Sequence, residues 1–301
     1  MLLDIHHSTI YTYSPQVNTA QHIAHLMPRN TPVQVVDMTG LGINPPPAQV
    51  RHSLDAFGNH RSFFSIPTAH TELSVSAHSR LETQPSSLSR AEVDHLANTS
   101  LPWEKLRERF RYQAGASFDE AQEFVFASPY VQAHAEFANY ARKSFSPNRP
   151  ALQAAIELMS RIHQDFEYAS LSTDVHTPAL EALAQRRGVC QDFAHIMLAC
   201  LRTLGLAARY VSGYVLTHPP EGQPRLIGCD ASHAWVSLYL PEVGWFDLDP
   251  TNNRCGLNSP GEDYACVAWG RDFGDVSPVR GVIHGGASHT LQVAVTVTPL
   301  G

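Results

Sequence analysis

Residues 186–215 read RRGVCQDFAHIMLACLRTLGLAARYVSGYV, and they predict a turn, a helix and a strand in succession. Gly188 permits a tight turn, and Asp192 lies in what would be the first helical turn. Apolar residues then recur at helical spacing until Gly205, after which the pattern RYVSGYVL predicts a strand. This order places Cys190 at the N-terminus of the helix.

A helix N-terminus is a suitable place for a reactive cysteine. Its unpaired N–H groups and the positive end of the helix dipole stabilise an anion, and they lower a thiol pKa from about 8.5 toward neutrality. Cys190 is therefore a candidate nucleophile. Cys200, in the same helix, has no such surroundings and is interpreted as a packing residue. His195 lies about 140° around the helix from Cys190 and is expected to point away from its thiol.

A cysteine nucleophile also needs an imidazole and a group that orients it. His233 opens the expected strand HAWVSLYL, and Asp249 closes the expected strand GWFDLD, with PEVG as the turn between them. A plain hairpin would place Asp249 opposite about Val236, some 10 Å along the strand from His233 at ~3.3 Å per residue. We therefore expect a bulge, a longer loop or strong twist here. Asp247 and Asp230 remain alternative carboxylates.

The residue pattern changes along the chain. Residues 1–88 contain short runs of alternating polar and apolar residues, separated by turn-forming residues, and this pattern predicts a β-rich N-terminal module. A helical lead-in is expected over 89–149, with a capping box at Ser117–Glu120, and an amphipathic helix follows it. We assign residues 89–301 to a second domain, which includes a C-terminal strand segment over 276–301.

Composition excludes several functions. The 301 residues carry a net charge of −7 and no long run of Lys or Arg, so neither nucleic-acid nor membrane binding is expected. The N-terminus lacks the pattern of a signal peptide, which favours a cytoplasmic protein. Neither the five cysteines nor the 17 histidines follow a standard zinc pattern, so we expect no metal and no cofactor.

Several motifs resemble one known family. GVCQDFAH, LGLAARYVSGY, ASHAWVSLYLPEVGWFDLDPTN and GRDFGDVSPVRG resemble the bacterial transglutaminase-like superfamily and occur in the order found there. The segment YTYSPQVNTAQHIAHLMPR resembles the β-rich N-terminal region that often precedes this core in bacteria. The resemblance spans most of the chain and is weakest between about 90 and 149.

The resemblance implies an α+β fold with a papain-like core, in which helices pack on an antiparallel sheet. It assigns the catalytic triad to Cys190, His233 and Asp249, with an acyl carbon attacked by the cysteine. The backbone N–H of Cys190 is the expected first donor of an oxyanion hole. The second donor stays open between Gln191 and a backbone group before Gly188.

Three functions follow from this reading. The favoured one is a thiol amidohydrolase of the cysteine peptidase type, acting on a peptide or small amide through a thioester. The same residues would serve a transglutaminase, in which an amine instead of water resolves the thioester. The third is a binding protein with an inactive papain-like core. The sequence predicts no oligomeric state.

Overall fold

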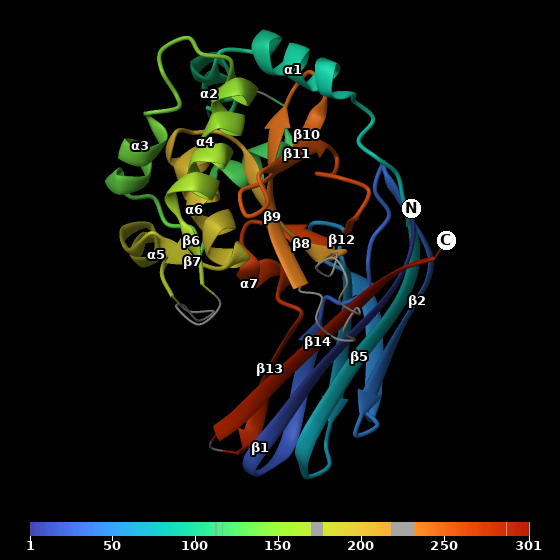
Figure 1. The fold of residues 1–301 in the computed structure, drawn as a ribbon. Helices are drawn as coiled ribbons and strands as arrows, with labels where there is room; N and C mark the ends of the chain where they lie inside the picture. The colour runs from blue at the N-terminus through green and yellow to red at the C-terminus, as the bar shows by residue number, and fades with distance from the viewer. Residues whose placement is uncertain (112, 116, 170–176, 218–231, 287, 301) are drawn as a thin grey trace.

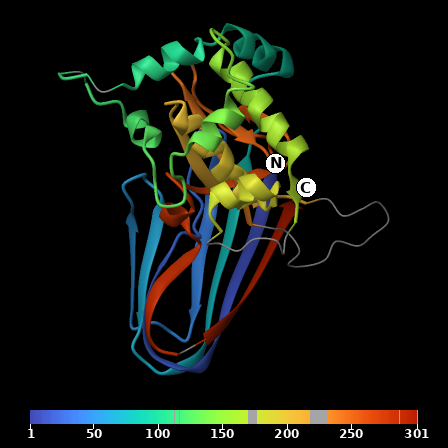
Figure 2. The same ribbon diagram turned by 90° about the vertical axis from the view of Figure 1, so that its left-hand side faces the viewer.

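The computed structural model describes residues 1–111, 113–115, 117–169, 177–217, 232–286 and 288–300 (Figure 1). It contains two antiparallel sheets and a layer of helices. Figures 1 and 2 show the helices gathered at one end of the molecule and a long curved sheet extending from the other, with the two chain termini side by side. This is an α+β fold, as predicted.

The long sheet has seven strands, five of them in the order β2-β5-β1-β4-β3. Its strands from the N-terminal region are β1 (Leu2–Ala24), β2 (Gln34–Asn44), β3 (Gln49–Leu54), β4 (His60–Ile66) and β5 (His70–Thr83). In β4 and β5 buried and more exposed residues alternate, as expected of a sheet with one packed face. These strands lie within the predicted β-rich region.

The remaining two strands of this sheet come from the other end of the chain. β13 (Val279–Gly285) pairs with the second half of β1, and β14 (Ser288–Leu300) pairs with its first half. We expected residues 276–301 to be a strand segment of the core domain; the strands pair with β1, while Val276, Val295 and Val297 pack in the same apolar cluster as α6. The physical reason for this pairing is that β1 is 23 residues long and bends, so its two halves offer separate ladders to β13 and β14.

The helices surround α6 (Cys190–Thr203), which is the most buried of them in the described part of the chain. The others are α1 (Arg90–Thr99), α2 (Trp103–Arg109), the 3₁₀ helix η1 (Glu120–Val125), α3 (Ala135–Ala141), α4 (Ala151–Asp165), α5 (Ala179–Gln185) and α7 (Phe273–Val276). The expected capping box at Ser117–Glu120 is wrong: Asp119 caps η1 by accepting from the Ala121 N–H at 3.0 Å. No helix of the described ranges is long and apolar enough to cross a membrane.

The second sheet has five strands in the order β11-β10-β9-β8-β12. Their bounds are β8 (Ala208–Val215), β9 (Ser232–Leu240), β10 (Gly244–Asp249), β11 (Arg254–Leu257) and β12 (Tyr264–Gly270), and a two-stranded ladder joins β6 (Glu167–Tyr168) to β7 (Arg187–Gly188). Residues of one sheet face, including Val236, Leu238 and Leu248, join the apolar residues of α6 in the main core. The helix is thus fixed against the strands that carry His233 and Asp249.

The long sheet covers the free edge of β12. Gln34 hydrogen-bonds both the N–H and the carbonyl of Cys266 at 2.8 Å, and Asn59 does the same for Trp269 at 3.0 and 2.7 Å. Each side-chain amide therefore takes the place of a further strand, which protects an edge that would otherwise be open to pairing with another chain.

Candidate active site

Cys190 is the first residue of α6, as the sequence predicts, and its side chain is partly exposed. Asp192 fixes this helix start, because its Oδ2 accepts a hydrogen bond from the Val189 N–H at 2.8 Å. Gly188 leaves room for that carboxylate: a Cβ on this residue would lie 2.6 Å from Asp192 Oδ2. The glycine and the aspartate of GVCQD therefore act together to orient the cysteine.

His233 and Asp249 lie side by side. His233 Nε2 is 2.7 Å from Asp249 Oδ2, and the two residues are 6% and 0% exposed. The register pairs Leu248 with Val236 and shows no shift along the hairpin, so Asp249 follows directly opposite Trp235. His233 is then a diagonal neighbour on the same sheet face, within reach of a long side chain. Of the expected bulge, longer loop or strong twist, the hairpin ladder shows no bulge, and the side chains reach across the remaining gap.

The Cys190 side chain lies close enough to the His233 ring to favour its cation. Its Sγ is 4.0 Å from the carbonyl oxygen of Ser232, the residue before the histidine. Burial of the ring disfavours its cation, but Asp249 and Cys190 outweigh this effect and raise the pKa of His233 to about 10. At neutral pH the ring is therefore cationic, which is an environment that stabilises a thiolate.

Three further groups hold the Asp249 carboxylate. Tyr264 donates its hydroxyl to Oδ2 at 2.7 Å, and Asn252 donates its amide to the same oxygen at 2.8 Å. The backbone N–H of Thr251 donates to Oδ1 at 2.8 Å. Burial alone would raise the pKa of Asp249, but His233 and these donors hold it below its usual value. The carboxylate is thus kept charged and in one orientation.

The alternative residues lie elsewhere. Asp247 accepts a hydrogen bond from the Trp235 indole at 2.9 Å and has no contact with His233, while Asp230 and Cys229 lie outside the described residues. Cys200 is fully buried. His195 is also buried and accepts from the Phe273 N–H at 3.2 Å, which leaves it a structural role.

Sequence reasoning missed two aromatic residues near Cys190. Tyr168 is 53% exposed and stands next to α6, with its ring 6.3 Å from that of Phe193. Its pKa is raised by burial of the hydroxyl and by the negative charges of Cys190 and Asp192. Tyr264 was missed because it reaches Asp249 from another strand, β12, and no sequence pattern indicates that these two strands bring the residues together. Asn252, inside DPTN, offered a local signal as a turn residue.

One cluster of described residues has the composition of a metal site. Asp4, His6 and His78 lie on the long sheet, and the Asp4 carboxylate is 3.0 Å from the Nε2 atom of each histidine. The two rings are stacked at 3.9 Å with an angle of 15°, so their lone pairs run parallel and do not converge on one ion. Hydrogen bonds to Asp4 explain the cluster without a metal.

The fold and the site together define a class. A cysteine begins a helix that packs on an antiparallel sheet, and adjacent strands of that sheet carry a histidine and an aspartate; this is the transglutaminase-like arrangement. Residues 138–250 match the transglutaminase-like superfamily core, and residues 3–82 match the bacterial transglutaminase-like N-terminal region. The chain belongs to the transglutaminase-like superfamily, which confirms the resemblance seen in its motifs.

Relatives and solved structures agree with this placement. An uncharacterized protein of Mycobacterium tuberculosis is 38% identical over 97% of this chain and 91% of its own length. The protein-glutamine gamma-glutamyltransferase of Pseudomonas aeruginosa is 32% identical over 102 residues, which are 31% of this chain and 15% of that protein. A crystal structure from Cytophaga hutchinsonii, described as a "putative cysteine protease", has a TM-score of 0.74 and 22% identity and covers 100% of this chain and 92% of its own. At that identity, the structural likeness shows the fold.

Proposed function

We propose that this protein is a cysteine-dependent amide or peptide hydrolase with Cys190, His233 and Asp249 as its catalytic triad. One observation carries the proposal: the imidazole of His233 lies 2.7 Å from the buried Asp249 carboxylate through Nε2, and Cys190, at the start of α6, interacts with the same ring. Such an arrangement activates a thiol and fixes the histidine tautomer at the same time.

In the first half-reaction, the Cys190 sulfur adds to the carbonyl carbon of the substrate amide. The backbone N–H of Cys190, which has no intrahelical acceptor at this position, faces the developing oxyanion. His233, which already holds the proton in the resting cysteine–histidine pair, passes it to the leaving amine as the C–N bond breaks. The product of this step is a thioester on Cys190 and a free amine.

In the second half-reaction, water attacks the thioester carbonyl. His233 accepts a proton from the water, the C–S bond breaks, and the carboxylic acid product leaves while the proton returns to the cysteine–histidine pair. Asp249 stays ionised throughout and stabilises the imidazolium. Its lowered pKa supports this role.

A second candidate is acyl transfer to an amine. The similarity to a gamma-glutamyltransferase over 102 residues supports it, because both reactions pass through the same thioester. The two candidates differ only in the molecule that resolves the intermediate, and the triad serves both.

A trapping experiment tests the proposal. The protein is incubated with a library of peptides and amides, quenched in acid, and searched by mass spectrometry for an acyl adduct on Cys190. Chase with water and with a labelled primary amine then measures partition: a predominance of free acid supports hydrolysis, and a predominance of amine conjugate supports acyl transfer. The absence of any adduct, together with Cys190 alkylation no faster than that of an ordinary thiol, would favour a non-catalytic binding protein.

A further inference from the structure

A cavity lies between the long sheet and the face of the core sheet remote from α6. It has a volume of about 1460 Å³, and none of Cys190, His233 and Asp249 lines it. Its walls come from the loops around Arg29 and Asp55, from η1, and from residues of β8, β9, β10 and β12. It is therefore separate from the candidate active site.

A stack of aromatic and guanidinium groups forms one wall. The Arg209 guanidinium lies 4.1 Å from the ring centre of Trp245 and 3.7 Å from that of Trp269. Arg29 lies 3.3 Å from the ring centre of Trp269. In such contacts the aromatic rings cover the planar faces of the guanidinium. Its N–H groups, which point outward in the plane, can then still donate hydrogen bonds.

Arg209 is the unsatisfied member of this stack. It is only 7% exposed, its Nε is enclosed without a hydrogen bond, and no described residue accepts a hydrogen bond from its guanidinium or forms an ion pair with it. Burial of the side chain lowers the pKa of Arg209 to about 9. Asp247 favours the Arg209 cation electrostatically but forms no ion pair with it. A carboxylate placed at the guanidinium edge would offset the remaining cost of burying this charge.

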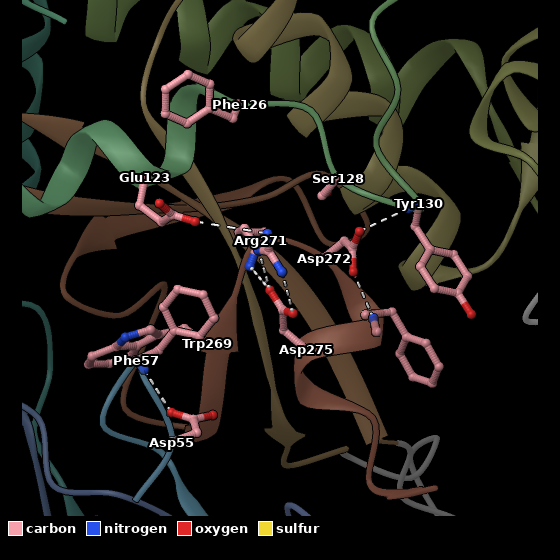
Figure 3. A network of polar contacts seen from close by, with 12 residues as sticks. Asp55, Phe57, Glu123, Phe126, Ser128, Tyr130, Trp269, Arg271, Asp272 and Asp275 are labelled. Carbon is pink, nitrogen blue, oxygen red and sulfur yellow. Dashed lines mark hydrogen bonds and ion pairs between the residues drawn. The ribbon is translucent and has the colours of Figure 1, made fainter.

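Several acidic residues of the cavity are engaged with other groups. Figure 3 shows Arg271 between Glu123 of η1 and Asp275 of α7, at 3.9 and 2.9 Å. In the same view Asp55 accepts from the Phe57 N–H at 2.8 Å, and it also accepts from Asn59. Asp247, on the same sheet face as Arg209, accepts from Trp235 through Oδ2, while its Oδ1 is buried without a hydrogen bond. None of these carboxylates forms an ion pair with Arg209, although Asp247 acts on it electrostatically, and together they disfavour a ligand with several negative charges.

We propose that this cavity binds an organic monocarboxylate with an aromatic or apolar body, whose carboxylate pairs edge-on with Arg209. The planar fork of a guanidinium matches the two oxygens of a carboxylate. Phe57, Phe124, Tyr239 and Trp245 line the same space and supply apolar contact for the body. The proposal is independent of the chemistry at Cys190.

Binding is tested on the full chain with N-acetylphenylalanine as the probe and its neutral amide as the matched control. Trp245 and Trp269 flank Arg209, so occupancy should change tryptophan fluorescence. We expect saturable binding of the acid, at least about 10-fold weaker binding of the amide, and a loss of about 10- to 100-fold in acid affinity in Arg209→Gln. The carboxylate could belong to a simple aromatic acid or to the C-terminus of a peptide, and phenylacetate as a third probe distinguishes the two. Binding equal to that of N-acetylphenylalanine indicates a simple aromatic acid, and weaker binding indicates a peptide C-terminus.

Two further measurements keep the test decisive. Arg209→Lys retains the charge without the planar fork, and it should also bind the acid more weakly; this variant serves if Arg209→Gln does not fold. Wild-type protein with Cys190 blocked by iodoacetamide should bind the acid as well as unblocked protein does. Failure of the wild type to bind the acid, equal binding of acid and amide, or loss of binding after the block would each overturn the proposal.

Discussion

The Tyr264 hydroxyl and the Asp249 carboxylate are 2.7 Å apart, the same separation as that between the carboxylate and His233. Asp249 thus receives hydrogen bonds from two strands, β9 and β12, that lie on opposite sides of β8. The tyrosine is part of the environment that keeps this carboxylate charged, although it lies outside the histidine–aspartate hairpin, on β12.

We expect Tyr264→Phe to lower kcat/KM about 10-fold, because loss of one charged hydrogen bond is worth about 1.5 kcal/mol. The pKa of Asp249 should rise, which moves the acid limb of the pH–rate profile to higher pH. Tyr214→Phe is the matched control, since it removes another buried hydroxyl, bonded to His7 at 3.0 Å, away from the triad. Both variants should lose similar stability, and an equal fall in kcat/KM in both would contradict the role of Tyr264.

Asp249→Asn should destabilise the protein in a pH-dependent way. The pKa of His233 is raised from 6.5 to about 10, so its contribution to folding is complete below about pH 6.5 and disappears as the pH rises toward 10. The lowered pKa of Asp249 removes the contribution again in strong acid. Urea denaturation should therefore show a difference from wild type of about 3 kcal/mol near pH 6 that shrinks by pH 9.5.

A control separates this effect from the loss of any carboxylate. Asp165 accepts a hydrogen bond from the Tyr140 hydroxyl at 2.8 Å, and it is not among the groups that act on His233. Asp165→Asn should show no comparable loss between pH 6.5 and 9.5. If the stability difference between wild type and Asp249→Asn did not change across that pH range, Asp249 would not be the group that raises the pKa of His233.

Cys190 should be the first described cysteine to react with iodoacetamide near pH 7. Burial raises the pKa of the Cys200 thiol far above its usual value and that of Cys266 to about 12, so neither forms a thiolate at this pH. Peptide mapping of briefly alkylated protein measures the order. Cys190→Ala should abolish both the rapid labelling and the turnover, while Cys200→Ala should keep both. Labelling of Cys200 before Cys190 in the wild type would contradict this prediction.

Gly188→Ala should impair the helix start. Its Cβ would meet Asp192 Oδ2 at 2.6 Å and push the carboxylate off the Val189 N–H, a contact comparable to an N-cap at about 1 kcal/mol. We expect slower alkylation of Cys190 at neutral pH and a modest loss of stability. Gly40→Ala is the control, because a Cβ there meets no atom within 4 Å. Unchanged alkylation in Gly188→Ala would show that Asp192 does not orient the cysteine.

Local patterns predicted much of the candidate site. The helix start at Cys190 followed from Gly188, Asp192 and the apolar spacing, and the hairpin between His233 and Asp249 followed from alternation around PEVG. The register of that hairpin was predicted one residue away from its observed value, because the end residues of a turn are weakly specified by composition. That difference of one residue, with the diagonal reach of His233, removes the need for a bulge.

What the sequence did not predict depends on contacts between distant segments. Tyr264 of β12 reaches Asp249 of β10 past β8 and β9, and Arg209, Trp245 and Trp269 meet from three different strands. Alternation within a strand indicates which face a residue occupies, but not which strands are neighbours. The same reasoning explains the placement of 276–301: an alternating strand was evident, while its partner, β1, lay at the far end of the chain.

The pairing of β13 and β14 with β1 has an evolutionary consequence. The chain leaves the long sheet at Thr83 and returns to it at Val279, so the core that carries Cys190 is an insertion within one continuous sheet. Recombination at those two points would leave every ladder of the host sheet intact, although an exchanged core would still have to fit Leu3, Ile5 and Val295 of that sheet. A single crossover after β5 would instead join β1 to return strands from a different parent, so β1 and the return strands must fit one another although almost the whole chain separates them.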